Sequence, residues 1–289
     1  AAFADAARSS GGAAWVRDRL SWGHVEPEPG QYQWGNYERA IDAQHRAGLS
    51  IVTVFHDTTH WARPEGKPHK SFPDDIRHAH RFGQALAERF KGRIQAYEIW
   101  NEADIAPFAL ETADRYAPVL KAARLGVKAG DPGAIVLMNS FAVLSRNFGE
   151  VLFENEIAGY TDAYNHHLYR PADQHPATLA WHRALAAPYG LAPLAHWVTE
   201  AGIALPDRGG RLSEEDRGKQ AAFVAKSYAQ SLAAGVDRHF YFIFPYYKEG
   251  ATNFGLLDAD LAPTPGAAAF ATMSQALGAA QPRGQGIAS

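Results

Sequence analysis

Apolar residues along this chain follow two alternating spacings, which predict a repeated strand–helix order. Short runs rich in β-branched residues, such as Ser-Ile-Val-Thr-Val-Phe at 50–55, are typical of parallel strands that are buried on both faces. Apolar residues at helical spacing lie between these runs, as in 74–90, where Asp74 or Asp75 is expected to cap the helix. Strands are expected at 13–20, 50–55, 94–100, 134–138, 161–166, 194–199 and 237–244. Helices are expected at 36–47, 74–90, 113–129, 148–157, 177–187, 214–234 and 266–277.

This order predicts an α/β fold with a parallel sheet and helices outside it. A closed (β/α)8 barrel, the TIM barrel, has eight strands, so the pattern predicts a TIM barrel whose first strand is missing from the given chain. The segment 3–8 looks like the end of a first helix, and we expect the natural polypeptide to extend before Ala1 and supply that strand. One catalytic barrel domain is expected over 1–280, followed by a flexible, polar and glycine-rich tail over 281–289.

Composition narrows the possible partners. Of the 289 residues, 46% are hydrophobic and 20% charged, and the net charge of -3 gives no reason to expect nucleic acid or an anionic membrane as a partner. No run of eighteen apolar residues predicts a membrane span, and no signal peptide is visible in the given chain. Cysteine is absent, which excludes disulfides, thiolate nucleophiles and cysteine-ligated metal sites. Nothing in the sequence indicates an oligomeric state.

Two strand-like runs, 96–102 and 195–200, end in a glutamate, Glu102 and Glu200. In a parallel barrel, the carboxyl ends of all strands share one rim. Cleavage of a glycosidic bond needs one protonated and one ionised carboxyl group, and two neighbouring carboxyl groups push their pKa values apart. Aromatic residues that could stack on a sugar face include Trp61 and Tyr246. Other polar residues expected at the rim are Arg17, His56, His60, Asn101, His167 and Tyr169.

The run Tyr97-Glu98-Ile99-Trp100-Asn101-Glu102 resembles the acid/base strand of clan A glycoside hydrolases. It is most similar to family 39, which includes β-xylosidases, α-L-iduronidases and bacterial exopolysaccharide hydrolases. Further blocks resemble that family in the same order along most of the chain: Trp15-Val16-Arg17 with Trp22 and Glu26-Pro27, Asp162 with His166-His167-Leu168-Tyr169, Thr199-Glu200-Ala201-Gly202, and Phe254-Gly255-Leu256-Leu257-Asp258.

The resemblance implies a retaining glycoside hydrolase that cleaves an oligo- or polysaccharide by double displacement. It implies that Glu200 is the nucleophile and Glu102 the general acid/base. Such an enzyme uses no metal or cofactor, and its function favours a secreted or periplasmic location.

The same resemblance assigns the substrate-binding residues. Asn101 matches a residue that hydrogen-bonds the sugar 2-hydroxyl, and Tyr169 one that hydrogen-bonds the nucleophile. Arg17 matches an arginine that keeps the nucleophile ionised, and His56 and His167 match histidines of the rim. One departure concerns the eighth strand, where the clan usually offers a tryptophan as the sugar platform. Residues 238–247 contain phenylalanine and tyrosine instead, which leaves the identity of the sugar open.

Two alternatives remain open at this stage. A metal-dependent sugar isomerase-like barrel would use Glu102, His167 and Glu200 as ligands. A non-catalytic barrel would bind a glycan without cutting it. His56 and His60 have an i, i+4 spacing, but they lack the glutamate of a His-Glu-x-x-His helix. Exo or endo action depends on loop shapes. The basic residues on the predicted rim loops, which could favour an anionic sugar, are Arg63, Lys67, Arg170 and Lys248.

Overall fold

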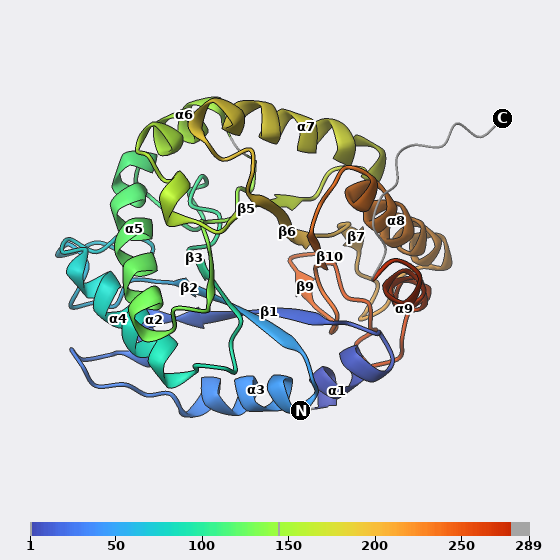
Figure 1. Cartoon of the computed structure of the whole chain (residues 1–289). Coiled ribbons are helices and arrows are strands. Elements are labelled where there is room, and N and C mark those ends of the chain that lie inside the picture. Colours follow the sequence, from blue (N-terminus) through green and yellow to red (C-terminus); the bar gives the residue numbers. More distant parts are fainter. Residues whose placement is uncertain (1, 144, 279–289) are drawn as a thin grey trace. The chain divides into compact units, whose positions relative to one another are not determined.

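The structure is a computed structural model that describes residues 2–143 and 145–278. Its elements follow the expected strand–helix order (Figure 1). The parallel strands are β1 (Trp15–Ser21), β2 (Ser50–His56), β3 (Ala96–Ile99), β4 (Ile135–Leu137), β5 (Ala163–Leu168), β6 (Ala195–Ala201) and β8 (Arg238–Tyr241). The α-helices are α1 (Ala2–Ser9), α2 (Trp22–Val25), α3 (Gly35–Arg46), α4 (Arg77–Arg89), α5 (Ala113–Gly130), α6 (Arg146–Glu154), α7 (His175–Ala186), α8 (Glu214–Ala233) and α9 (Pro265–Leu277). Short 3-10 turns are η1 (Ala158–Tyr160), η2 (Ala172–Gln174) and η3 (Ala187–Tyr189).

The chain divides into two compact units. The N-terminal unit consists of Trp15–His166 and Arg183–Ala195. The C-terminal unit consists of Ala1–Ala14, His167–His182 and His196–Ser289. The expectation of a single domain over 1–280 stays a prediction, as does the strand expected before Ala1. The expected tail at 281–289 lies outside the described residues.

In the N-terminal unit, strands β1 to β5 are hydrogen-bonded in chain order and run parallel. Ile51 to Phe55 of β2 are all buried, as expected for a parallel strand covered on both faces. Helices α3, α4 and α5 lie along the outer side of these strands (Figure 1). The core between strands and helices is rich in aromatic rings, and Trp22 stacks on Phe82 with ring centroids 5.1 Å apart.

Helices α4 and α5 of this unit cross very closely because glycines line the contact. A Cβ added to Gly126 of α5 would lie 1.9 Å from the carbonyl oxygen of His80 in α4. A Cβ on Gly130 would lie 2.5 Å from the carbonyl oxygen of Gln84. The backbones of the two helices therefore meet where no side chain fits.

The start of α4 differs from the expected one. The helix begins at Arg77, with Ile76 as its N-cap and no side-chain capping bond from that residue. Asp75 instead accepts hydrogen bonds from the Arg77 backbone N–H and guanidinium. The expected start at residue 74 is wrong because 74–76 form a bend stabilised by the Asp75–Arg77 pair.

In the C-terminal unit, β6 pairs in parallel with β8, with an irregularity between Val198 and Ala201. β8 ends at Tyr241 rather than at the expected residue 244, because the N–H of Ile243 donates to Phe254 in a following loop. That loop contributes to a small antiparallel sheet that the sequence pattern did not predict. Its strands are β7 (Leu205–Pro206), β10 (Thr252–Asn253) and β9 (Lys248–Glu249), in that order.

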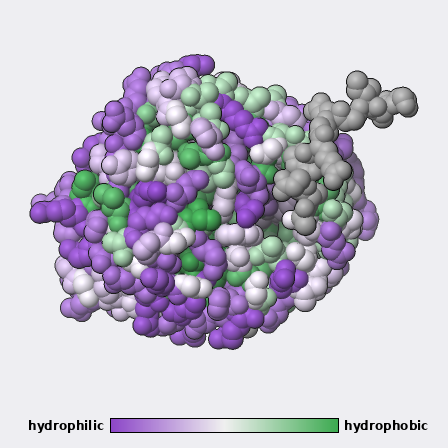
Figure 2. Space-filling view, in the orientation of Figure 1, coloured by the Kyte–Doolittle hydropathy of each residue, from purple (hydrophilic) through white to green (hydrophobic). Residues whose placement is uncertain are grey.

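Hydrophilic residues and smaller apolar patches intermingle on the face drawn in Figure 2. Large exposed apolar side chains such as Ile76, Leu125 and Val151 are ordinary for a protein surface. Within residues 2–143 and 145–278, no helix combines the length and apolar character needed to cross a membrane.

Candidate active site

Glu102 follows β3 at a turn with an unusual backbone. Trp100 and Glu102 have φ angles of 77° and 44°, in the left-handed region that residues other than glycine rarely adopt. The Glu102 N–H donates to Ser140 Oγ at 3.3 Å, and the Trp100 indole N–H donates to the Phe108 carbonyl at 3.0 Å. Each such residue costs about 1–3 kcal/mol and persists only where its surroundings hold it in place. This turn presents Glu102 and Asn101 at the carboxyl end of β3.

Arg17 of β1 reaches across β2 to side chains at the carboxyl end of β3. Its Nε and Nη2 donate to the two carboxylate oxygens of Glu98 at 2.7 and 2.8 Å, and Nη2 also donates to Asn101 Oδ1 at 2.6 Å. Glu98 is fully buried and forms an ion pair with Arg17, so its carboxylate has a structural role. Because Asn101 Oδ1 accepts from Arg17, the amide NH2 is the group that Asn101 can offer to a ligand. The expected action of Arg17 on Glu200 stays a prediction.

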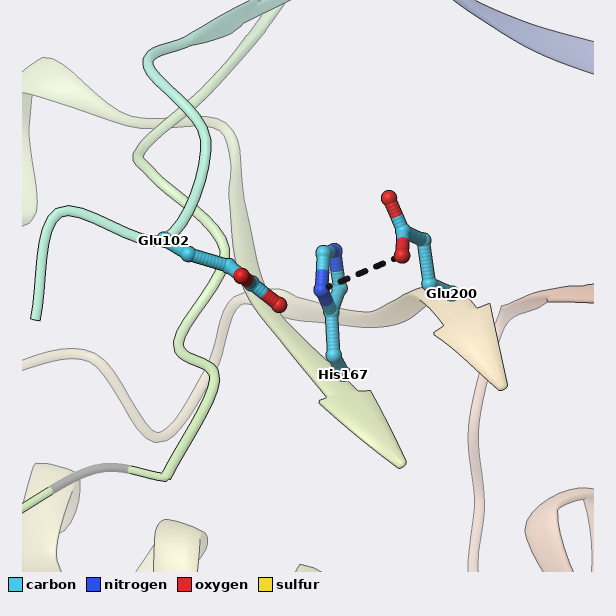
Figure 3. Close-up of side chains that lie close together, drawn as sticks. All are labelled: Glu102, His167 and Glu200. Atoms are coloured by element: carbon cyan, nitrogen blue, oxygen red, sulfur yellow. Dashed lines mark ion pairs between the residues drawn. The ribbon is translucent and has the colours of Figure 1, made fainter. Parts of the chain in front are cut away.

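Glu200 lies near the end of β6 in the C-terminal unit, where two side chains approach one of its oxygens. The Tyr169 hydroxyl donates to Oε2 at 2.5 Å. His167 Nδ1 lies 3.6 Å from the same oxygen, the pair marked by the dashed line in Figure 3. Glu200 is 8% exposed and the His167 side chain is fully buried. The sequence therefore identified three residues that meet in this unit.

Gly202 allows Tyr169 to reach Glu200. A Cβ at this position would lie 2.6 Å from the Phe242 carbonyl oxygen and 3.1 Å from the Tyr169 ring. The Tyr169 ring also packs edge-on against Phe242 and Phe254, each with a centroid distance of 6.1 Å. Phe242 and Phe254 thus hold the ring of Tyr169, the residue that hydrogen-bonds Glu200.

His56 forms a pair with the next residue in the chain. Its Nδ1 lies 2.9 Å from Asp57 Oδ1. Burial opposes ionisation of Asp57, but the hydrogen bond from His56 and the charges of His56 and His69 lower its pKa below the usual value. The ionised Asp57 orients the imidazole through Nδ1, which leaves Nε2 to contact a ligand. His60 is exposed on the following loop.

Trp61 makes the contacts of a loop-packing residue. Its indole N–H donates to the Glu26 carbonyl at 3.0 Å, and its ring meets Trp22 and His78 edge-on. The side chain is half-buried. Its role as a sugar platform stays a prediction, in competition with this packing role.

Tyr246 belongs to a polar cluster on the small antiparallel sheet. Its hydroxyl donates to Asp207 Oδ1 at 3.1 Å, and Lys248 Nζ lies 3.4 Å from Asp207 Oδ2. Burial opposes ionisation of Asp207, but hydrogen bonds from Gly210 N–H, Tyr246 and Lys248 lower its pKa. Lys248 thus lies beside Asp207 with its side chain half-exposed, and its expected preference for an anionic sugar stays a prediction. Sequence reasoning missed Asp207, although an aspartate just before a Gly-Gly turn is a visible signal.

The three residues that could ligate a metal ion, Glu102, His167 and Glu200, do not all belong to one unit. His167 and Glu200 offer a nitrogen and an oxygen 3.6 Å apart in the C-terminal unit, whereas Glu102 belongs to the N-terminal unit. Imidazole nitrogen with carboxylate oxygen suits several transition metals, so the donor types themselves do not decide against a metal.

No protein-family profile and no curated protein matches this sequence. Solved structures do match. A family 39 glycoside hydrolase from the gut symbiont Bacteroides cellulosilyticus is similar with a TM-score of 0.73 and 20% identity, over 96% of this chain and 61% of that one. A glucosidase from Croceicoccus marinus has a TM-score of 0.74 and 16% identity, over 94% and 63%. A family 39 β-xylosidase from Caulobacter crescentus has a TM-score of 0.72 and 17% identity, over 95% and 67%.

This chain therefore spans less than two thirds of the length of the first two proteins. At sequence identities of 16–20%, the structural similarity establishes the fold alone. The seven parallel strands of the described residues, with their helices, form the TIM-barrel-type fold of family 39 glycoside hydrolases, with one strand of the eight missing, as the sequence predicted.

Proposed function

We propose that this chain is a retaining glycoside hydrolase that acts on an oligo- or polysaccharide, with Glu200 as nucleophile and Glu102 as general acid/base. The environment of Glu200 carries the proposal: a nearly buried carboxylate at the end of a parallel strand, with Tyr169 donating to one oxygen and His167 beside it. Strand ends of this kind are where TIM-barrel enzymes carry their chemistry. The similar structures named above, a family 39 glycoside hydrolase, a glucosidase and a β-xylosidase, support the same class of reaction.

In the first step, a carboxylate oxygen of Glu200 attacks the anomeric carbon while Glu102 gives its proton to the leaving oxygen. The bond between the anomeric carbon and the leaving oxygen breaks as the glycosyl–Glu200 ester forms. The hydrogen bond from Tyr169 holds the nucleophile in one rotamer, so less motion is lost on reaching the transition state.

In the second step, Glu102 takes a proton from a water molecule that attacks the anomeric carbon. The ester bond to Glu200 breaks, and the sugar leaves with its original configuration. Asn101 contributes in both steps by donating its amide N–H to the sugar 2-hydroxyl, a bond that strengthens in the transition state. Arg17 supports this role because it engages the Asn101 oxygen and so fixes which way the amide points.

The decisive experiment compares Glu200→Ala and Glu102→Ala on aryl glycosides with good and poor leaving groups. We expect Glu200→Ala to abolish turnover of every substrate, because no covalent intermediate forms. Glu102→Ala should lose much less activity on good leaving groups, which need little protonation, and added azide should partly restore its turnover as a β-glycosyl azide. Glu154→Ala, which removes an exposed carboxylate on α6, is the matched control and should behave as wild type.

Equal losses in both active-site variants for all leaving groups, without azide rescue, would contradict the assigned roles. The metal-dependent alternative predicts loss of wild-type activity in chelator and its return on adding a divalent cation. A glycan-binding barrel predicts sugar binding by calorimetry with no product formed. A panel of aryl glycosides and polysaccharides in the same assays identifies the sugar.

A further inference from the structure

Tyr116 of α5 contacts the backbone on which the Glu102 turn rests. Its side chain is fully buried, and its hydroxyl makes two short hydrogen bonds. It donates to the carbonyl of Ile99, the last residue of β3, at 2.5 Å. It also accepts from the N–H of Asn139, which follows β4, at 2.7 Å. One hydroxyl thus joins the carboxyl ends of two adjacent strands.

The first of these bonds fixes the peptide at which the chain leaves β3. On one side of the Ile99–Trp100 peptide, the carbonyl oxygen is held by Tyr116. On the other side, the Trp100 N–H donates to the Phe55 carbonyl at 2.8 Å. Trp100 then enters the left-handed region, with a φ of 77°. A peptide plane fixed at both ends leaves the chain one direction in which to continue toward Asn101 and Glu102.

The second bond holds the other support of the turn. Asn139 precedes Ser140, whose Oγ accepts from the Glu102 N–H at 3.3 Å. Tyr116 therefore holds the turn from two sides. It fixes Ile99, which precedes the turn, and it fixes the 139–140 backbone, to which the Glu102 N–H is bonded. These bonds close a ring from Tyr116 through Ile99, the turn, Ser140 and Asn139 back to Tyr116.

We propose that Tyr116 is a positioning residue for the general acid/base, acting through this ring of hydrogen bonds; the inference rests on the proposed function of Glu102. The tyrosine does not reach the substrate itself. Loss of its hydroxyl would let the left-handed turn relax toward ordinary backbone angles and would displace the Glu102 carboxyl group from the leaving oxygen.

The hydroxyl suits this task because it stays protonated. Burial raises the pKa of Tyr116 well above its usual value, so the hydroxyl remains a donor to Ile99 at neutral pH. A phenylalanine at position 116 would keep the ring packing, including the contact with Phe72, whose ring centroid lies 5.7 Å away. It would lose both hydrogen bonds.

The test compares Tyr116→Phe with Tyr97→Phe. Tyr97 lies on β3 and is equally buried, but its hydroxyl has no hydrogen-bond partner among the described residues, so the same atom is removed without breaking a bond. For Tyr116→Phe we expect kcat/KM to fall roughly 10- to 100-fold on poor leaving groups and less than about threefold on activated aryl glycosides, because a misplaced acid matters only where protonation limits the rate. Tyr97→Phe should stay within about twofold of wild type on both.

Amide hydrogen exchange gives a readout that needs no activity. We expect the amides of Asn139 and Glu102 to exchange at least about tenfold faster in Tyr116→Phe than in Tyr97→Phe, with no such difference at the buried amides of β2. Unchanged exchange at both residues, or a rate loss independent of the leaving group, would overturn the proposal. A wild-type enzyme without glycosidase activity would refute the proposed function instead, while the exchange data still decide whether Tyr116 holds the turn.

Should Tyr116→Phe fail to fold, Ser140→Ala opens the same ring at its other side. It removes the acceptor of the Glu102 N–H and should produce the same dependence on the leaving group. Wild-type behaviour of Ser140→Ala would contradict the ring as the positioning element.

Discussion

The hydroxyl of Tyr169 donates to Oε2 of Glu200 at 2.5 Å, and Gly202 leaves the room for this approach. The bond joins residues 31 positions apart in the chain, at the ends of β5 and β6. A carboxylate bound in this way is oriented before substrate arrives, which is what a nucleophile in a rigid active site requires.

Removal of that hydroxyl should slow the reaction without unfolding the protein. We expect Tyr169→Phe to lower kcat about 10- to 100-fold, in line with the loss of one pre-organised hydrogen bond in an active site. The melting temperature should change little, because Tyr169 is 43% exposed. Tyr247→Phe is the control: its ring packs on the same Phe242 and Phe254, and its activity should stay near wild type. Equal kinetics of the two variants would mean that Tyr169 does not serve the nucleophile.

The anomeric configuration of the product should be retained. Double displacement inverts the anomeric carbon twice, and it requires carboxyl groups ~5–5.5 Å apart rather than the ~6.5–9.5 Å of inverting enzymes. Proton NMR of the first product formed, recorded before mutarotation, measures the configuration directly. An inverted anomer would exclude the glycosyl–Glu200 ester.

The α4–α5 contact should tolerate no side chain at its glycines. Gly126→Ala would place a methyl group 1.9 Å from the His80 carbonyl oxygen, so the helices must separate. We expect the free energy of unfolding to fall by about 3 kcal/mol or more, at the upper end of overpacking effects. Thermal and denaturant melts measure the loss.

Gly218→Ala should raise the free energy of unfolding in the same melts. This glycine lies inside α8, and nothing lies within 4 Å of an added Cβ. Its replacement should raise stability by about 0.5–1 kcal/mol, because glycine costs that much in a helix interior. A stable Gly126→Ala protein would show that α4 and α5 do not pack at this distance.

Buried histidines should make the protein lose stability as the pH falls. Burial, with a smaller contribution from His175, lowers the pKa of His239 to about 3. The folded state therefore keeps His239 neutral while the unfolded state binds a proton below about pH 6.5, so the stability that is present above pH 6.5 is lost on acidification. Ser227 lies between the two rings, with Oγ 3.0 Å from His239 Nε2 and 3.4 Å from His175 Nδ1. The Tyr228 ring packs against His239 at a tilt, with ring centroids 4.4 Å apart.

His239→Gln tests this linkage, because it keeps a polar side chain but cannot titrate. Between about pH 6 and pH 4, wild type should lose about 1.4 kcal/mol more unfolding free energy per pH unit than the variant. Urea melts across this range measure the difference. His60→Gln removes an exposed histidine and should leave the wild-type slope unchanged. Parallel slopes for wild type and His239→Gln would show that His239 is already protonated in the folded state.

Several features follow from the sequence alone. Apolar runs such as 50–55 and the helical spacing between them define a parallel α/β fold, because local pattern fixes which face of each element is buried. The same order places Glu102 and Glu200 at strand ends, where parallel topology gathers functional groups. The pairing of Tyr169 with Glu200 was available from the family resemblance.

Other features required the tertiary structure. The sheet of β7, β10 and β9 consists of two-residue strands, too short to show a period, and its β7–β10 pairing joins residues 205–206 to residues 252–253. The Asp207–Tyr246 contact depends on that pairing. The hydroxyl of Tyr116 reaches Ile99 and Asn139 only because α5 packs behind β3 and β4, although as a sequence position it looks like any other core aromatic. Sequence pattern determines which faces are buried, whereas the polar atoms that meet between those faces are set by the packing of whole elements.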